Sequence, residues 1–265
     1  RKSSGHKQEF DEQKFLASLL FSGASEKVAK QVLTDIKPKI KPNTSTRKIS
    51  RMAFERLKHY SKSSAVNYSL KKAIYDLGPE GHLFEKFMSG ILAAKGYEVR
   101  TGIILKGKCV SHEVDVIGER SDHVIYMECK FHNSPSRKND VKTALYIYAR
   151  SLDLRENPKN NFQEFWLASN TSYTQDAIRY ADCVGMKLIG INGPHGNSIQ
   201  ELINRYKVHP ITCLQKLKVY QKKKLMAHKV VFCRELMDQP NLIDILDVSA
   251  EEKKSILLEV KRMMG

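Results

Sequence analysis

The stretch from His112 to His132 constrains the fold of this chain more than any other part of the sequence. It holds two short runs of β-branched and aromatic residues, which alternate with polar residues on either side of Ser121-Asp122. Such alternation indicates strands with one buried face, and a short polar break between two such runs indicates a tight connection. We therefore predict an antiparallel hairpin here.

Three charged side chains of this hairpin are predicted to converge. Side chains of a strand alternate between its two faces, so Glu128 and Lys130 project from the same face of the second strand. Asp115 projects from the first strand, on the face opposite Val114 and Val116. Mg²⁺ binds through one or two carboxylates, and a nearby amine stabilises charge that develops on a phosphate. The hairpin therefore predicts a divalent-metal site, with Asp115 and Glu128 as ligands and Lys130 beside them.

A further acid is expected to join this group from an upstream helix. Residues 81–97 have apolar side chains at helical spacing, which predicts an amphipathic helix. Glu85 shares a helical row with Met88 and Leu92, three and seven residues on, so it lies at the edge of the apolar stripe. A carboxylate in that position is rarely left unpaired. We expect its partner to be the metal or Lys130.

Four motifs follow one another in an order that resembles one nuclease superfamily. They are Phe84-Glu85, Gly96-Tyr97-Glu98-Val99, Glu113-Val114-Asp115-Val116 and Glu128-Cys129-Lys130. The order resembles the PD-(D/E)xK superfamily, most closely its Mrr-type restriction-endonuclease-like domain. The resemblance implies that Asp115 and Glu128 bind the metal and that Lys130 and Glu85 are catalytic. Mrr-type proteins often have Gln at the position of Glu128, so this chain follows the broader superfamily pattern, which favours an active site.

The resemblance continues downstream of the hairpin. Residues 161–170 are expected to form a third strand, residues 171–185 a helix and residues 186–191 a fourth strand, which is the usual tail of Mrr-type domains. The implied fold class is α/β, with a restriction-endonuclease-like mixed-sheet core over residues 78–207.

Three neighbouring residues have less specific interpretations. His112 and His132 flank the motif, and each either contacts phosphate or metal or is a hydrogen-bonded neighbour of the site. Cys129 lies between two site residues along the strand and therefore points to the opposite face. We expect it to serve as a small apolar core residue.

Composition points to a polyanionic partner in a reducing compartment. The chain has 45 Lys and Arg against 29 Asp and Glu, a formal net charge of +16, which favours DNA as the partner.

The five cysteines follow neither zinc nor disulfide spacing, which suggests a location in the reducing cytoplasm. The chain contains no apolar run of membrane-spanning length and no signal-peptide pattern, so no membrane partner is expected. Because Arg1 falls in an expected strand, we expect native residues to precede it.

The first 77 residues differ in character from the rest of the chain, and Gly78-Pro79 marks the boundary that follows them. Periodicity predicts four helices, over 13–22, 26–36, 46–59 and 65–75. The motifs in this part resemble an ATP-cone, and they occupy 2–5, 9–14, 44–49 and 67–70. The resemblance implies that ATP or dATP binds through Lys2, Lys14 and Thr46, with Ser3 replacing a phosphate-binding Arg. No phosphate-binding loop of the GxxxxGK[ST] type is present, so the nucleotide would regulate. The alternative is a helical DNA-binding or dimerisation module.

Residues 208–265 are predicted to form a small helical domain. Ser249 followed by Glu252 is a capping-box signal. The order of short helices faintly resembles helix-hairpin-helix or RNA-polymerase α C-terminal-type domains, which hold the DNA backbone at helix N-termini. The alternative is a helical cap that covers the sheet or pairs two chains. The basic run 221–224 is either a phosphate patch or a solvated face.

Together these features predict a metal-dependent DNA endonuclease that uses Mg²⁺ or Mn²⁺ and is regulated by ATP or dATP. A homodimer is expected, because one site hydrolyses one strand and two sites related by two-fold symmetry cut both. The competing interpretation is a non-catalytic, nucleotide-responsive DNA-binding protein. The intact set of Asp115, Glu128 and Lys130 favours the enzyme, since a pure DNA-binding protein has no need of it.

Overall fold

The computed structural model describes residues 9–20, 22–79, 81–134, 137–194 and 196–264. The chain divides into two compact units, residues 1–72 and residues 73–265. Among the described residues, no helix is long and apolar enough to cross a membrane. The boundary between the units falls inside a helix, five residues before the predicted domain boundary that follows residue 77.

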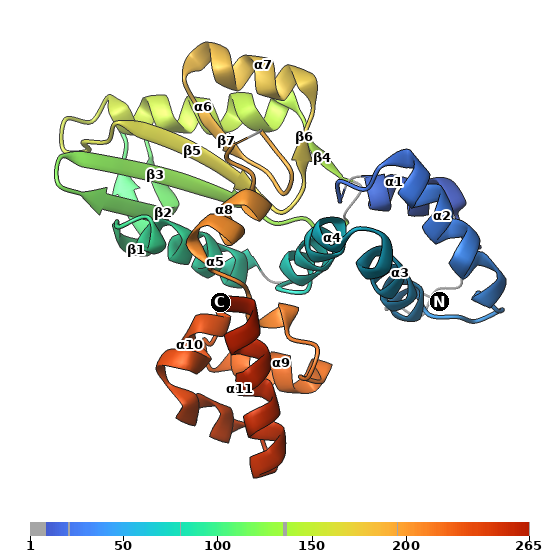
Figure 1. Cartoon of the computed structure of the whole chain (residues 1–265). Helices are drawn as coiled ribbons and strands as arrows, with labels where there is room; N and C mark the ends of the chain where they lie inside the picture. Colours follow the sequence, from blue (N-terminus) through green and yellow to red (C-terminus); the bar gives the residue numbers. More distant parts are fainter. Residues whose placement is uncertain (1–8, 21, 80, 135–136, 195, 265) are drawn as a thin grey trace. The chain divides into compact units, whose positions relative to one another are not determined.

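The first unit is helical. Its elements are α1 (Glu12–Leu20), α2 (Glu26–Ile36), the 3₁₀ helix η1 (Lys37–Lys39), α3 (Thr46–Tyr60) and α4 (Lys62–Tyr75), the last of which continues into the second unit (Figure 1). The hydroxyls of Ser25 and Ser45 accept hydrogen bonds from the backbone N–H groups of Val28 and Lys48 and so begin α2 and α3. The four predicted helices are confirmed, and each end lies within three residues of its predicted position.

The second unit contains a five-stranded mixed sheet. Its strands, in spatial order, are β1 (Glu98–Lys106), β2 (Ser111–Arg120), β3 (His123–Lys130), β5 (Glu164–Ser169) and β7 (Lys187–Ile189). Strand β2 pairs antiparallel with β1 and with β3, whereas β5 pairs parallel with β3 and with β7. Two shorter strands, β4 (Lys138–Asn139) and β6 (Ser172–Tyr173), pair with each other. The predicted hairpin and α/β class are confirmed.

Helices cover both faces of this sheet (Figure 1). On one face α5 (Gly81–Ala94) packs against β1, β2 and β3. On the other, α6 (Val141–Arg155) and α7 (Gln175–Val184) bury a cluster that includes Ile147, Leu154 and Ala181 with strand residues such as Tyr126 and Leu167.

One predicted boundary was wrong. Residues 171–185 were expected to be helical throughout, but Ser172–Tyr173 form β6 and α7 begins at Gln175. The hydroxyl of Thr174 accepts from the N–H of Ala177, which caps α7 at this point. Residues 172–173 pair with β4, which is remote in sequence, and are therefore extended and not helical.

The C-terminal segment is a set of short helices in the same compact unit as the sheet. They are α8 (Ile199–Tyr206), η2 (Ile211–Cys213), α9 (Val219–Ala227), α10 (Cys233–Asp238), η3 (Pro240–Ile245) and α11 (Ala250–Met264). The predicted capping box is confirmed by bonds from the N–H of Glu252 to Ser249 and from the N–H of Ser249 to Glu252. The Phe232 ring stacks on Phe87 of α5 at 5.5 Å between centroids.

Candidate active site

The candidate site lies where β2 and β3 separate. The antiparallel pairing of these strands ends at Val116 and Met127, and the next residue on each strand is Asp115 and Glu128 respectively. The carboxylate of Asp115 accepts a hydrogen bond from the backbone N–H of Cys129, with 2.6 Å between Oδ2 and N. The side chain of Asp115 therefore takes up a strand N–H that has lost its ladder partner.

Strand β2 is irregular at this point. Val114 and Ile117 both pack into the cluster formed with α6, although a spacing of three would place them on opposite faces of a regular strand. Gly102, which lies between the two neighbouring ladder pairs on β1, has a φ of 63°. The expectation that Asp115 lies on a face opposite both Val114 and Val116 assumed a regular strand, and β2 is not regular at this point. The carboxylate of Asp115 bonds to the backbone of β3 instead.

Glu128 is the centre of an ion-pair network. It is only 3 % exposed, and its Oε1 lies 2.6 Å from the ammonium nitrogen of Lys130. This contact confirms that the two side chains share a face of β3. The other oxygen, Oε2, lies 2.7 Å from Nη1 of Arg150 on α6, and Nη2 of Arg150 donates to the carbonyl oxygen of Glu113.

The predicted set of site residues did not include Arg150. The spacing of Ala144, Ile147 and Leu154 and the N-cap Asp140 would have predicted α6. No local signal marks Arg150 as the partner of Glu128, which precedes it by 22 residues.

Glu85 faces the same region from α5. Burial raises its pKa above the ordinary value, and the negative charges of Glu113 and Glu128 add to the effect. Burial, followed by the charge of Glu128, raises the pKa of Asp115 from 3.8 to about 7. The structure thus places four acids near two cations, Lys130 and Arg150, so the site has a surplus of negative charge when all are ionised.

This donor set fits Mg²⁺ or Mn²⁺. Among the described residues, no group of three or more His, Cys, Asp or Glu is arranged to hold a metal ion. Mg²⁺ does not require such a group, since it takes one or two protein carboxylates and fills its remaining positions with waters and substrate phosphates. Asp115 and Glu128 can supply those two carboxylates, and the surplus negative charge around them favours a cation.

The flanking residues have structural partners. His112 Nε2 lies 2.8 Å from Asp153 of α6, and His132 Nε2 lies 2.8 Å from the side-chain oxygen of Asn139. Both histidines are therefore hydrogen-bonded neighbours of the site in this structure. Cys129 is buried, as expected, and burial raises the pKa of its thiol well above the ordinary value.

A buried polar network supports the backbone of Lys130. The hydroxyl of Ser169 donates to the carbonyl oxygen of Lys130 at 2.8 Å and accepts from the side-chain amide of Asn139 at 2.9 Å. The same amide donates to Thr171, and its oxygen bonds His132. Asn139 is 2 % exposed, and nothing in the residues around it in the sequence marks it as part of such a network.

The residues assigned to nucleotide binding belong to the first unit. Lys2 lies outside the described residues. Lys14 pairs with Asp11 at 2.9 Å on an exposed part of α1, and Thr46 is the first residue of α3. Their role in nucleotide binding stays a prediction.

Comparison with known proteins places the chain in a family. The model of the AF1548-like C-terminal family matches residues 209–264. An uncharacterised protein of Archaeoglobus fulgidus is 35 % identical over 180 residues, which are 67 % of this chain and all of that protein. The chain belongs to the AF1548-like family.

A solved structure of this AF1548-like family supports the observed fold. The crystal structure of the protein of unknown function AF1548 aligns with a TM-score of 0.56 and 32 % identity, and it covers 70 % of this chain and 99 % of that protein. The match to the family's C-terminal part begins at 209, next to the predicted domain boundary at 208.

Proposed function

We propose that this AF1548-like protein is a metal-dependent endonuclease that hydrolyses phosphodiester bonds of DNA, on a restriction-endonuclease-like core. The observation that carries the proposal has three parts: Asp115 and Glu128 flank the point where β2 and β3 separate, Lys130 pairs with Glu128, and the charges of Glu128 and Lys130 act on Glu85. These side chains come from one helix and two strands, and they are the four that the resemblance to PD-(D/E)xK nucleases singles out.

Asp115 and Glu128 would hold Mg²⁺ or Mn²⁺, which when bound supplies a Lewis acid for a phosphoryl oxygen and lowers the pKa of a water. The ammonium group of Lys130 would stabilise the negative charge that develops on the phosphate. Its side chain is 34 % exposed, which leaves it accessible to a substrate while Glu128 holds it. Arg150 fixes the second oxygen of Glu128 and so orients the carboxylate.

Glu85 would accept a proton from the attacking water. A base works best when its pKa lies near the operating pH, and burial and acidic neighbours shift the pKa of Glu85 upward. Regulation by ATP or dATP through Lys2, Lys14 and Thr46 forms a second part of the proposal, which the ATP-cone resemblance supports.

Nicking of a supercoiled plasmid in Mg²⁺ or Mn²⁺ tests the proposal. We expect D115N and E128Q each to lose more activity than the roughly 10–100-fold that removal of an outer-shell partner costs. Both should retain DNA affinity, because they leave the phosphate contacts in place. Glu119 lies on β2 with Asp115 and pairs with Arg100 at the surface, so E119Q is a matched control that should cut like the wild type.

Two results would contradict the enzyme proposal. Wild-type cutting by either variant would show that cleavage does not depend on these carboxylates. Tight DNA binding by the wild type, without cleavage in either metal, would favour the non-catalytic DNA-binding alternative.

A further inference from the structure

Positive charge is concentrated in the first unit. Residues 1–72 contain 17 Lys and Arg and 6 Asp and Glu, a net charge of +11, whereas residues 73–265 contain 28 and 23, a net charge of +5. The segment 37–62 alone contains nine basic residues and one acid, Glu55. Less than a third of the chain therefore carries most of its excess charge.

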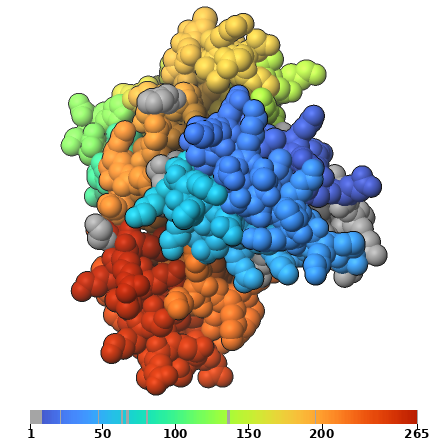
Figure 2. Space-filling view, turned by 45° about the vertical axis from the view of Figure 1, so that its right-hand side comes forward, coloured from blue at the N-terminus to red at the C-terminus, as the bar shows by residue number. Residues whose placement is uncertain are grey.

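Three of these residues form what we call the α3 basic face: Lys48, Arg51 and Lys58. Their spacings of three and seven place them on one side of the helix, opposite the buried Ala53 and Leu57. All three are exposed. Within the described part of the chain, none of them forms an ion pair. Figure 2 shows one side of the first unit, whose residues are coloured from blue to cyan.

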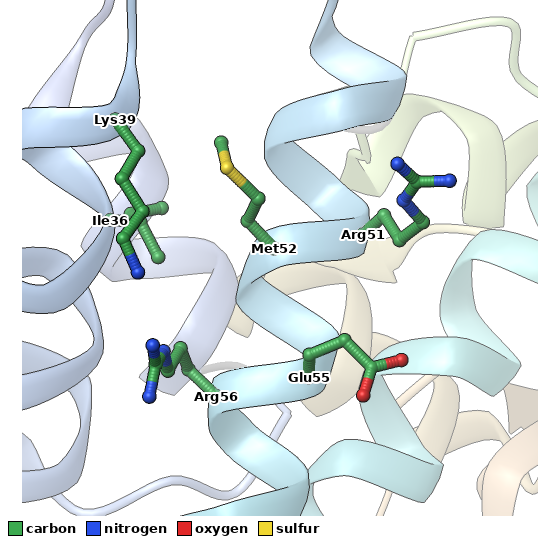
Figure 3. A pocket seen from close by; sticks show the side chains of 6 residues that line it. All are labelled: Ile36, Lys39, Arg51, Met52, Glu55 and Arg56. Carbon is green, nitrogen blue, oxygen red and sulfur yellow. The ribbon is translucent and has the colours of Figure 1, made fainter.

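A hollow of about 270 Å³ adjoins this face, and its lining residues are Ile36, Lys39, Arg51, Met52, Glu55 and Arg56. Lys39 and Arg56 reach from neighbouring helices toward the same space, and Arg51 and Glu55 lie on the other side of α3 (Figure 3). Its charged side chains are exposed or half-buried. Sites for small molecules are typically about 300–1,000 Å³, and they enclose the ligand among apolar groups. A long polyanion on the surface fits this lining better than a nucleotide does.

The candidate active site needs such a surface elsewhere. Glu85, Glu113, Asp115 and Glu128 act on one another by charge in the candidate active site, and in the absence of a metal their ionised forms repel phosphates. Non-specific affinity for DNA comes from lysine and arginine contacts to the phosphate backbone, with release of counterions. Substrate affinity is therefore expected from basic residues away from the acids.

We propose that the α3 basic face binds the phosphate backbone of double-stranded DNA. The identity of the polyanion rests on the proposed nuclease function, whereas the binding surface rests on the charges and exposure of α3. Each phosphate contact contributes about −0.9 to the slope of log affinity against log salt concentration. Loss of three contacts should therefore reduce that slope by about 2 to 3, and it should weaken binding at least tenfold at 0.1 M salt.

The test is fluorescence anisotropy of a labelled 30-base-pair duplex with the full chain in EDTA, at several salt concentrations. The variant K48A/R51A/K58A removes the α3 basic face. The matched control K254A/K261A/R262A also removes two lysines and one arginine, from exposed positions of α11, where Glu251, Glu252 and Glu259 offset the positive charge. Alanine is a strong helix former, so both variants should fold, and thermal melts followed by circular dichroism check this.

We expect a reduced slope for the α3 variant and a smaller change for the α11 variant. Equal losses in the two variants would show that affinity follows net charge, and they would overturn the proposal. Unchanged DNA affinity of the α3 variant would also overturn it, and loss of ATP binding alone would assign the face to nucleotide. The anisotropy assay contains no metal, so it measures DNA binding separately from cleavage. DNA binding through the α3 basic face, together with no cleavage of the plasmid in metal, would contradict only the proposed nuclease activity.

Discussion

Replacement of Asp115 by Asn should stabilise the metal-free protein at neutral and alkaline pH. The amide is nearly isosteric, and its oxygen can still accept from the N–H of Cys129. The pKa of Asp115 is about 7 in the folded protein and about 3.8 in the unfolded chain. A raised carboxyl pKa means that the folded state holds its proton more tightly. The free energy of unfolding therefore falls as pH rises from about 4 to about 7.

The magnitude follows from the size of this shift. About three pKa units at about 1.36 kcal/mol each correspond to a cost of about 4 kcal/mol for ionised Asp115 above pH 7. Asparagine does not titrate, so D115N avoids this cost. The variant should match the wild type near pH 4 and exceed its free energy of unfolding by up to about 4 kcal/mol at pH 8.

Urea denaturation in EDTA at pH 4, 6 and 8 measures this difference. Asp122 lies on the exposed turn of the same hairpin, so D122N is a matched control that should follow the wild type at every pH. A second measurement adds Mg²⁺ at pH 8. At 100 times its dissociation constant the ion should stabilise the wild type by about 2.7 kcal/mol and D115N by less. A D115N variant that is less stable than the wild type at pH 8 without metal would refute the idea that acidic neighbours and burial oppose this charge.

Four further predictions follow from the site and its surroundings. K130M should lose plasmid nicking but keep calorimetric metal binding, since the amine acts on the transition state; loss of metal binding would make Lys130 structural. A Cβ on Gly90 would overlap the Phe232 ring, so G90A should lower the free energy of unfolding by about 1–3 kcal/mol. An unchanged midpoint of urea denaturation would show that Phe232 does not pack on α5. Light scattering of the 30.3 kDa chain with DNA should give at least a dimer; a monomer mass would indicate a nickase. Calorimetric titration of ATP into the full chain should show binding of micromolar affinity or weaker, because Ser3 lacks the bidentate donor of Arg. Bound ATP should alter nicking without being hydrolysed. No heat at millimolar ATP would leave regulation unsupported.

Local pattern alone determined several elements of this protein. The alternation on either side of Ser121-Asp122 was sufficient for the hairpin, because side-chain direction in a strand has a period of two. The same period placed Glu128 and Lys130 on one face, where their side chains form an ion pair. Helix caps such as Ser45 and Ser249 depend only on residues within one turn, so they could also be recognised in the sequence.

Tertiary structure decided how the site is assembled. The end of the ladder at Val116 turned Asp115 toward β3, and the packing of α6 brought Arg150 to Glu128. Burial and the neighbouring acids raised the pKa of Asp115, and both depend on residues far apart in the chain. The periodicity of a short stretch of sequence does not encode contacts between distant segments or the burial of a side chain. The sequence therefore indicated that Glu128 and Lys130 would meet, and the packing of the sheet between its helices added Arg150 and set the orientation and charge of the site.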